Sequence, residues 1–460
     1  MFKIYQMPYL PLHISLGIKK LSFLFSFLLI SFFSLAQYPE ITAAINNAGK
    51  NELQSLDQVI SFIQSHGKND HEKAYGVYFW IAHNVKYDVK GYIKNLSSYS
   101  KPEDVFKKRK AICKGYSMLY EYMCTKLNLE CRMITGYSKG ASYKNGQAFT
   151  WSNHGWNAVK LDSVWYLIDV TWASGSLKGH KFKPSYNTSY FKANPQSFVV
   201  KHLPETPMWQ LLENPLSLKT FAAGDKKITE ELKQYPTPRF HYNDSIQLFL
   251  KQDSIQQTLD EGYKAMVFNP VNTSPLAFAM LNSTIYEVKK DSLNFRTLSL
   301  HDLDSLIKST NVATELLLKA KGSHKAFNEN VEHAAKRSYL ISGTLYYYKS
   351  EYLKKNANLD SMDHSFDSLI SYYNVYLLTL EKSVNDYRKS KETKILKVME
   401  PNLCYQYIRI YRKYTDRMES ENDATEKKAI QKERALLVSR AKRSFPPDSK
   451  YYKTIKERLK

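Results

Sequence analysis

The chain has 460 residues, more than one compact core usually holds, so we expect two folded units. Hydrophobic residues make up 43% and charged residues 24% of the chain, an ordinary globular balance that excludes a largely disordered protein. The formal net charge of +22 suits sequence-blind attraction to nucleic acid, anionic envelope polymers or acidic lipid head groups, although lysines that solvate long helices explain the same charge.

The first 36 residues are expected to be an export signal. Lys19 and Lys20 precede the uncharged run "LSFLFSFLLISFFSLA", which ends in the small-x-small pattern from Ser34 to Ala36. An uncleaved membrane anchor is the alternative, but 16 residues fall short of the roughly 20 that a spanning helix needs. We therefore expect cleavage after Ala36 and a periplasmic or secreted protein with no transmembrane segment. Export and the lack of a nucleic-acid motif both argue against a specific nucleic-acid partner.

Composition divides the remaining chain near residue 225. All six tryptophans lie between Trp80 and Trp209, and no proline occurs between Pro275 and Pro401. Turn-rich, aromatic chain thus gives way to long helical chain. Apolar residues recur there at helical spacing, namely Phe366, Leu369, Ile370, Tyr373, Leu377 and Leu380. We expect an α+β domain over residues 37–225 and a helical domain of unknown role over residues 226–460.

Two helices are expected early in the first domain. Apolar residues at helical spacing in "HEKAYGVYFWIAHNVKYD" predict one over about residues 74–85. In the second, positions 117, 120, 124 and 127 form one stripe of a helix that begins at Cys113 and runs to about Asn128. Cys113 is therefore expected at a helix N-terminus.

An antiparallel hairpin is expected after these helices. The strand "CRMITGY" is followed by two alternating segments, "HGWNAVKLD" and "SVWYLIDVTW". If Asp162 and Ser163 form a two-residue loop, His154 faces Thr171 and Trp156 faces Asp169. His154 then lies diagonal to Asp169 on the same face of the sheet. Diagonal neighbours have backbones about 7–8 Å apart, within reach of an imidazole and a carboxylate.

The four cysteines have different expected roles. A disulfide between Cys124 and Cys131 is possible in an exported protein, and a small apolar filler is the alternative for each of Cys124, Cys131 and Cys404. Cys113 differs because the positive end of a helix stabilises a thiolate and offers N–H groups to an oxyanion. The basic run "KKRK" at residues 107–110 adds charge of the same sign.

These residues together supply the parts of a thiol acyl-transfer site. Cys113 is the candidate nucleophile, His154 the general base and then acid, and Asp169 the group that orients the imidazole. Trp80 and Asn84 are candidate sources of a second oxyanion donor. No cofactor is expected, and no metal site, because no tight His/Cys/Asp spacing occurs. The other histidines of this region are assigned to surface or packing positions, namely His66, His71, His83, His180 and His202.

The same segments resemble a known family. "KAICKGYSMLYEYMCTKLNLECRMITGYSKG" and "HGWNAVKLDSVWYLIDVTWASG" are similar, in order and spacing, to the core of the transglutaminase-like superfamily, which includes transglutaminases, kyphoscoliosis-type peptidases and peptide N-glycanase relatives. The resemblance is close over about residues 70–175, and the stretch from Tyr190 to Phe221 is similar to the segment that follows the core in bacterial kyphoscoliosis-type relatives. It implies a papain-like α+β scaffold on which Cys113, His154 and Asp169 align with nucleophile, base and acid. Acidic calcium-site clusters are lacking, so calcium activation is not implied.

The leading hypothesis is an exported peptidase or amidase that acts on proteins or peptides through Cys113. A cross-linking transglutaminase is the first alternative, because an amine in place of water would give an isopeptide bond. A binding or scaffold protein of the cell envelope that retains the fold is the second.

Overall fold

The computed structural model describes residues 38–49, 51–94, 101–140, 143–144, 146–179, 181–235, 237–290, 298–320 and 393–459, with parts of 328–349 and 377–388. The expected export signal and most of the periodic segment between Phe366 and Leu380 lie outside the described residues. Within the described ranges, no helix combines the length and the apolar character needed to cross a bilayer.

Helices and strands are interspersed in the first half of the chain, and within the described residues only helices follow. The early helices are α2 (Pro39–Asn47), α3 (Leu56–His66), α4 (Asp70–Asn84), α5 (Val89–Lys94), α6 (Pro102–Lys108), α7 (Cys113–Lys126), α8 (Val170–Ser174), α9 (Pro195–Phe198) and α10 (Leu218–Ala222). The strands are β1 (Lys86–Tyr87), β2 (Lys110–Ala111), β3 (Cys131–Ser138), β4 (His154–Leu161), β5 (Val164–Ile168), β6 (Gly175–Lys178), β7 (Lys181–Pro184), β8 (Phe191–Ala193) and β9 (His202–Pro204). Short 3₁₀ turns cover Thr188–Tyr190 and Pro207–Gln210. The later helices are α11 (Asp225–Gln234), α12 (Tyr242–Leu250), α13 (Ser254–Phe268), α14 (Ser274–Lys290), α15 (Leu300–Lys319), α18 (Thr393–Ser420), α19 (Ala424–Arg443) and α20 (Lys450–Arg458).

Contacts within the chain divide it into two compact units. The first contains residues up to Asp88, Tyr99–Met133 and Trp156–Ala193, and the second contains Val89–Ser98, Ile134–Gly155 and Asn194–Lys460. This division differs from the boundary predicted near residue 225, which stays a prediction.

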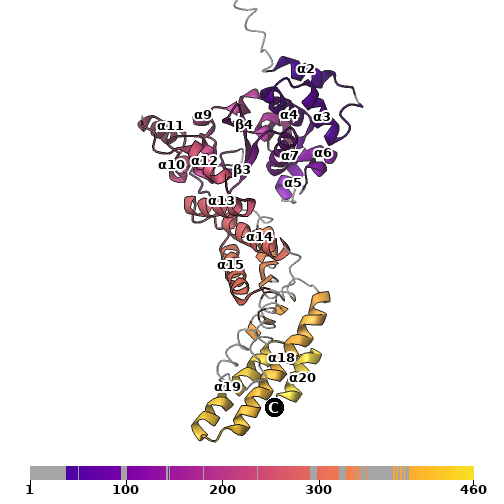
Figure 1. The fold of residues 1–460 in the computed structure, drawn as a ribbon, viewed down its shortest axis with the longest axis vertical. Helices are drawn as coiled ribbons and strands as arrows, with labels where there is room; N and C mark the ends of the chain where they lie inside the picture. The colour runs from indigo at the N-terminus through magenta and orange to yellow at the C-terminus, as the bar shows by residue number, and fades with distance from the viewer. Residues whose placement is uncertain are drawn as a thin grey trace, which may run out of the picture. The chain divides into compact units, whose positions relative to one another are not determined.

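The helices α4 and α7 lie side by side in the first unit (Figure 1). Asn69 caps α4 by accepting a hydrogen bond from the amide of Glu72. The fully buried Tyr116 of α7 donates its hydroxyl proton to the carbonyl of Val85 across 2.6 Å. Burial of an aromatic side chain of this size contributes about 1.5–3 kcal/mol to stability. Tyr116 therefore stabilises the packing of α7 through its ring and orients the helix through its hydroxyl group. Both predicted helices are present, α4 over a longer range than its apolar pattern indicated.

Gly115 permits the close approach of α7 to the segment before it. A Cβ built on this glycine would lie 2.6 Å from the Cβ of Ala111 and 3.2 Å from Cγ2 of Val105. The 2.6 Å contact is too short for two carbon atoms, so any larger residue at this position requires a shift of its surroundings. This glycine allows the first turn of α7, with Cys113 at its start, to pack against β2 and α6.

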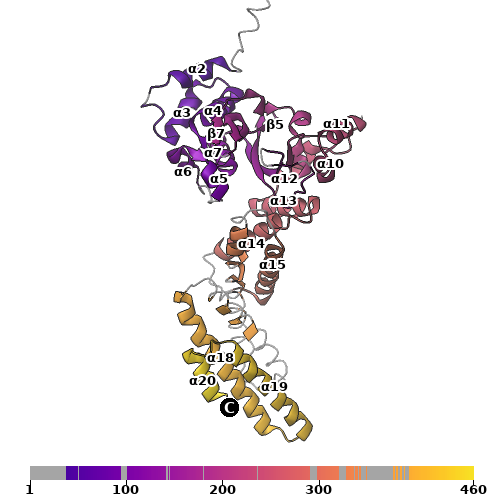
Figure 2. The ribbon, with the colours of Figure 1, turned by 180° about the vertical axis from the view of Figure 1, so that it is seen from behind.

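One antiparallel sheet has the strand order β8-β5-β4-β3-β9, and β5 is labelled in Figure 2. The pairing of Leu161 with Val164 makes Asp162 and Ser163 a two-residue loop, and both have positive φ, 47° and 66°. Such loops match the twist of a hairpin. The predicted hairpin register is therefore confirmed up to the pair of Asn157 with Ile168.

The second predicted strand of the hairpin was too long. β5 ends at Ile168, and the residues expected to continue it to Trp172 form the helix α8 instead. The cause is Asp169, whose Oδ1 accepts a 3.0 Å hydrogen bond from the amide of Trp172 and so caps a helix at this point. His154 therefore has no strand partner at Thr171, contrary to the register extended from the loop.

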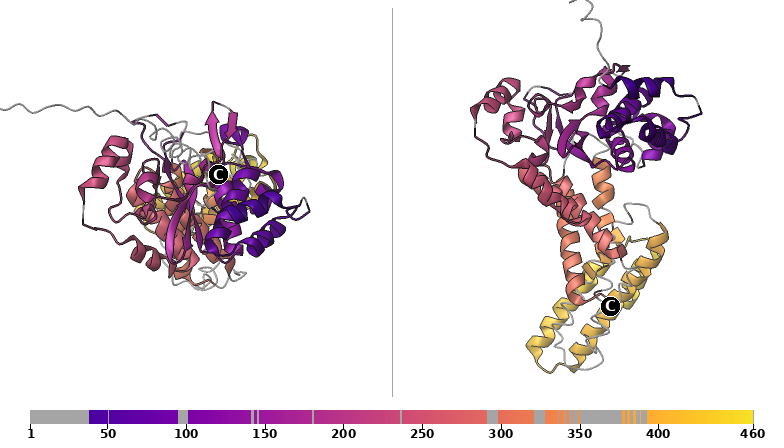
Figure 3. Two further views of the ribbon diagram at one scale, coloured as in Figure 1. Left: turned by 90° about the horizontal axis from the view of Figure 1, so that it is seen from above. Right: turned by 45° about the horizontal axis from the view of Figure 1, so that its top comes forward.

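The second unit is mainly helical beyond residue 218. Helices α18 and α19 pack against each other, and α20 packs against both. They form the orange-to-yellow group of helices in Figure 3. Their core consists of residues at helical spacing, including Leu403, Tyr407, Ile410 and Tyr414 of α18. The spacing buries one stripe of each helix, as expected for amphipathic helices that pack together.

Candidate active site

Cys113 is the first residue of α7, as predicted. Its N-cap is Ile112, and no described side chain caps this end of the helix. The carbonyl of Ile112 accepts hydrogen bonds from the amides of Gly115 at 2.8 Å and Tyr116 at 3.2 Å. Cys113 is only partly buried, whereas the other three cysteines are buried. A partly exposed cysteine at the positive end of a 14-residue helix has the surroundings that stabilise a thiolate.

The other three thiols are in a different environment. All four cysteines are free, so Cys124 and Cys131 are not bridged in this structure. Burial raises the pKa of Cys131 well above its usual value, and burial also raises the pKa of Cys404. Buried thiols of this kind are protonated and unreactive near neutral pH. They pack as small apolar residues, the second of the two expected roles.

His154 and Asp169 are brought together from opposite strands of the hairpin. His154 is the first residue of β4 and is 9% exposed, while Asp169 follows β5 directly and is fully buried. The main-chain amide of Asp169 donates to the carbonyl of Tyr190 at 3.0 Å, which adds a second anchor beside the helix cap. Burial raises the pKa of Tyr190, and the nearby negative charge of Asp169 raises it further. The carboxylate is thus fixed in position and sheltered from water.

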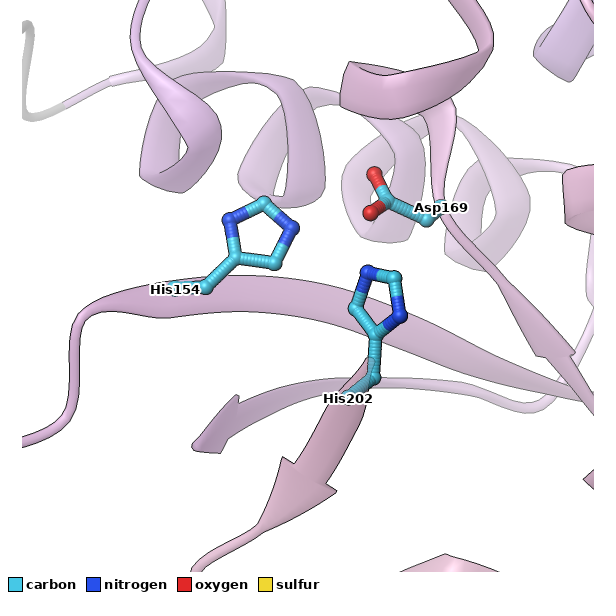
Figure 4. A group of neighbouring side chains, drawn as sticks. All are labelled: His154, Asp169 and His202. Atoms are coloured by element: carbon cyan, nitrogen blue, oxygen red, sulfur yellow. The ribbon is translucent and has the colours of Figure 1, made fainter. Parts of the chain in front are cut away.

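A third group, His202 of β9, belongs to the same cluster. His154, Asp169 and His202 each offer one nitrogen or oxygen, and these atoms all lie within 4.8 Å of one another. Figure 4 shows the three side chains pointing toward a common centre. His202 is 1% exposed and stacks on the ring of Phe198 with centroids 4.0 Å apart. Its assignment as an ordinary surface or packing residue missed its place beside the pair.

The cluster is also of a type that can bind a transition-metal ion, which the spacing in the sequence did not reveal. Imidazole and carboxylate are suitable ligands for zinc. Ligands of a tetrahedral zinc with bonds of 2.0–2.1 Å lie about 3.4 Å apart, so side chains up to 4.8 Å apart would have to close around the ion. An ion bound there would occupy His154 and remove it from any acid–base role.

Asn157 links the histidine strand to the cysteine helix. It lies on β4, is fully buried, and donates from Nδ2 to the carbonyl of Ser117 on α7 at 3.0 Å. The same nitrogen lies 3.5 Å from the carbonyl of Arg132 on β3. A buried side-chain amide that bonds to two elements fixes their separation. The sequence showed this asparagine only as part of a strand.

The two oxyanion candidates, Trp80 and Asn84, lie in the C-terminal part of α4. Trp80 is 1% exposed and stacks on Phe106, with ring centroids 5.5 Å apart. Asn84 is exposed and donates from Nδ2 to the carbonyl of Trp80 at 2.8 Å. Their oxyanion role stays a prediction, as do the catalytic roles of Cys113, His154 and Asp169.

Part of the chain is similar to known proteins. The family model described as Transglutaminase-like superfamily matches residues 58–170. Kyphoscoliosis peptidase of Homo sapiens and its Mus musculus counterpart are each 37% identical over 169 residues, which is 36% of this chain and 26% of theirs. Lim and transglutaminase domain protein ltd-1 of Caenorhabditis elegans is 27% identical over 198 residues, covering 38% of this chain and 26% of that protein.

One solved structure, "Crystal structure of a TGase", is 19% identical and covers 38% of this chain and 43% of that chain. Its TM-score of 0.21 is too low to support a conclusion. The chain spans about a quarter of the length of the curated relatives it matches. The matched residues nevertheless include α4, α7 and the hairpin that carry the site, so residues 58–170 form a transglutaminase-like domain.

Proposed function

We propose that the transglutaminase-like domain is a thiol acyl-transfer enzyme that hydrolyses amide bonds of proteins or peptides, with Cys113 as nucleophile, His154 as general base and acid, and Asp169 as the orienting carboxylate. The observation that carries this proposal is the sheltered pair of His154 and Asp169, whose ligand atoms lie within 4.8 Å. The match of residues 58–170 to the transglutaminase-like superfamily supports acyl transfer as the reaction class.

The first half of the reaction forms a thioester. The Cys113 thiolate attacks the amide carbon, a C–S bond forms, and the carbonyl oxygen becomes an oxyanion near the N-terminus of α7. His154, protonated in the resting pair, then gives its proton to the amine nitrogen as the C–N bond breaks. Asp169 stabilises the imidazolium and fixes its tautomer.

The second half releases the acyl group to water. Neutral His154 accepts a proton from a water molecule while the oxygen of that water attacks the thioester carbon. The C–S bond breaks, the acid leaves, and the thiolate is restored beside an imidazolium. A lysine amine in place of the water would give an isopeptide bond instead, which is the chemistry of the cross-linking alternative.

Product analysis separates these outcomes. The purified protein and its Cys113→Ala variant are incubated with the same mixture of folded and unfolded proteins, and the products are analysed by mass spectrometry. We expect new chain termini that only the unsubstituted protein generates. Isopeptide-linked masses would identify a cross-linker, and identical products from both proteins would refute the proposal and favour a binding or scaffold role.

Export of the chain is a separate proposal. If residues 1–36 act as a signal, the protein recovered from outside the cytoplasm begins at Gln37. N-terminal sequencing of that protein tests the site of cleavage. A chain that starts at Met1 and stays with the membrane would support the anchor alternative instead.

A further inference from the structure

A pocket of about 550 Å³ opens beside the segment that leads to Cys113. It lies within the first unit, between the short parallel pair β1–β2 and the β6–β7 hairpin. The residues that line it are Asn84, Lys86, Tyr87, Lys108, Arg109, Lys110, Phe182 and Pro184. The volume is within the range of sites that bind small ligands or short chain segments, about 300–1,000 Å³.

The lining is strongly basic and contains no acid. The "KKRK" run of the sequence supplies three of the cations, and β1 supplies the fourth, Lys86. Lys86 and Lys110 are direct partners in the parallel pairing, so their backbones are about 4.8 Å apart. Lys110 forms an ion pair with Asp88 at 2.9 Å, whereas Lys86 is exposed and has no carboxylate partner among the described residues. Like charges held this close repel one another, and an anion would relieve the repulsion.

Arg109 is held in place by stacking. Its guanidinium carbon lies 4.0 Å from the ring centroid of Phe106 and 4.5 Å from that of Trp80. No described carboxylate pairs with it, and its buried Nη1 donates no hydrogen bond within the described part of the chain. Burial lowers the pKa of Arg109, although the group stays charged. A partly desolvated, immobilised cation gains more from an anionic ligand than a freely hydrated lysine does.

The backbone of Arg109 is also unusual. Its φ of 52° puts a non-glycine residue in the left-handed region at the end of α6. The strain persists because the carbonyl of Arg109 accepts a 2.9 Å hydrogen bond from the amide of Lys86, which begins the β1–β2 pairing. The turn at Arg109 thus brings Lys86 of β1 and Lys110 of β2 to the same pocket.

The pocket lies close to the nucleophile. Lys110 precedes Cys113 by three residues, so their Cα atoms are at most about 11 Å apart. The rings of Tyr87 and Phe182, with centroids 6.2 Å apart, add an aromatic wall. The pocket thus combines cations with aromatic rings and lies within about three residues' length of Cys113. A substrate chain bound at Cys113 could therefore place a neighbouring segment in the pocket.

We propose that this pocket, lined by Lys86, Arg109 and Lys110, binds carboxylate side chains of an acidic peptide segment and so selects substrates for Cys113. The inference rests on the proposed function for its link to catalysis, but binding can be measured without turnover. A confined pocket with aromatic walls favours a peptide over a long anionic polymer, which would need an extended basic stripe.

Binding is tested with full-length protein that carries Cys113→Ala, so that no probe is consumed. Fluorescence anisotropy compares a fluorescein-labelled glutamate-rich hexapeptide with its glutamine counterpart. We expect at least tenfold tighter binding of the acidic peptide at 0.15 M salt, because hydrogen bonds between a cation and a carboxylate are stronger than those between a cation and a neutral amide. Lys86→Glu should remove most of this preference. Lys126→Glu is the matched control, since Lys126 is an exposed lysine of the same unit outside the pocket.

Three results would overturn the inference. The glutamic and glutamine peptides could bind equally, Lys126→Glu could weaken binding as much as Lys86→Glu, or a single-stranded oligonucleotide could bind in the same site more tightly than the peptide. The comparison of the two peptides uses no pocket variant, so its result does not depend on whether Lys86→Glu folds. New termini in the product assay without binding of the acidic peptide would refute this inference but not the proposed function. Binding of the peptide without new termini would refute only the proposed function.

Discussion

Glu205 makes a quantitative prediction about stability and pH. Its side chain is 5% exposed, and its two oxygens accept hydrogen bonds from Oγ1 of Thr135 at 2.7 Å and Nδ2 of Asn272 at 2.9 Å. Burial raises the pKa of Glu205 from 4.5 to about 7, although both hydrogen bonds act in the opposite direction. Desolvation is therefore the dominant effect at this carboxyl group.

The sign and size follow from proton linkage. Between pH 4.5 and 7 the folded protein holds a proton on Glu205 that the unfolded chain has lost, so the free energy of unfolding falls as pH rises through this range. Each pH unit corresponds to about 1.4 kcal/mol, which gives a loss of about 3 kcal/mol from this one group. Above pH 7 the contribution is constant.

Urea unfolding at pH 5 and pH 8 measures the effect. Glu205→Gln resembles the protonated acid, because its amide can donate to Thr135 while its carbonyl accepts from Asn272. The variant should match the unsubstituted protein at pH 5 and exceed its stability by about 3 kcal/mol at pH 8. Glu213→Gln, at an exposed position, should leave the pH dependence unchanged. An identical pH dependence in the Glu205→Gln variant and the unsubstituted protein would refute the reasoning.

Three further substitutions test how the site is built. Gly115→Ala should cost about 1–3 kcal/mol through its contact with Ala111, and adding Ala111→Gly should recover part of the loss in urea unfolding; simple additivity would contradict this. Asn157→Ala should lower the unfolding free energy by about 1–3 kcal/mol, since it removes the buried bond to Ser117; an unchanged unfolding midpoint would contradict that bond's importance. Asp169→Asn should keep the helix cap, and hence the melting temperature, but lower kcat by up to about 10⁴-fold; full activity would exclude an orienting role for the carboxylate.

Local signals in the sequence were sufficient for the elements that carry Cys113 and His154. The buried stripe at positions 117, 120, 124 and 127 predicted α7, because each of these residues faces the core. The two-residue loop fixed the hairpin register, since a pair on either side of the loop determines every other pair. Helical spacing and turn chemistry act over a few residues and are therefore visible in sequence.

Three features of the site and of the basic pocket were not predicted from the sequence. Asp169 was read as part of a strand, because alternation alone cannot show that its carboxylate caps a helix. His202 lies on a three-residue strand, too short for any periodicity, and joins the site only because β9 pairs with β3. The basic pocket combines the "KKRK" run with Lys86, which is brought beside it by the β1–β2 pairing. The last two cases required a contact between segments far apart in sequence, whereas the Asp169 cap is a local hydrogen bond that competes with the strand pattern.

The alkylation rate of Cys113 as a function of pH tests the central claim most directly. Iodoacetamide reacts with the thiolate, and peptide mass spectrometry follows each cysteine separately, with the buried Cys124, Cys131 and Cys404 as internal references. We predict rapid labelling of Cys113 at neutral pH with a midpoint below about 8.5, and a slower reaction with a higher midpoint in His154→Ala. A Cys113 that reacts like an ordinary thiol, with the same profile in the two proteins, would contradict the account.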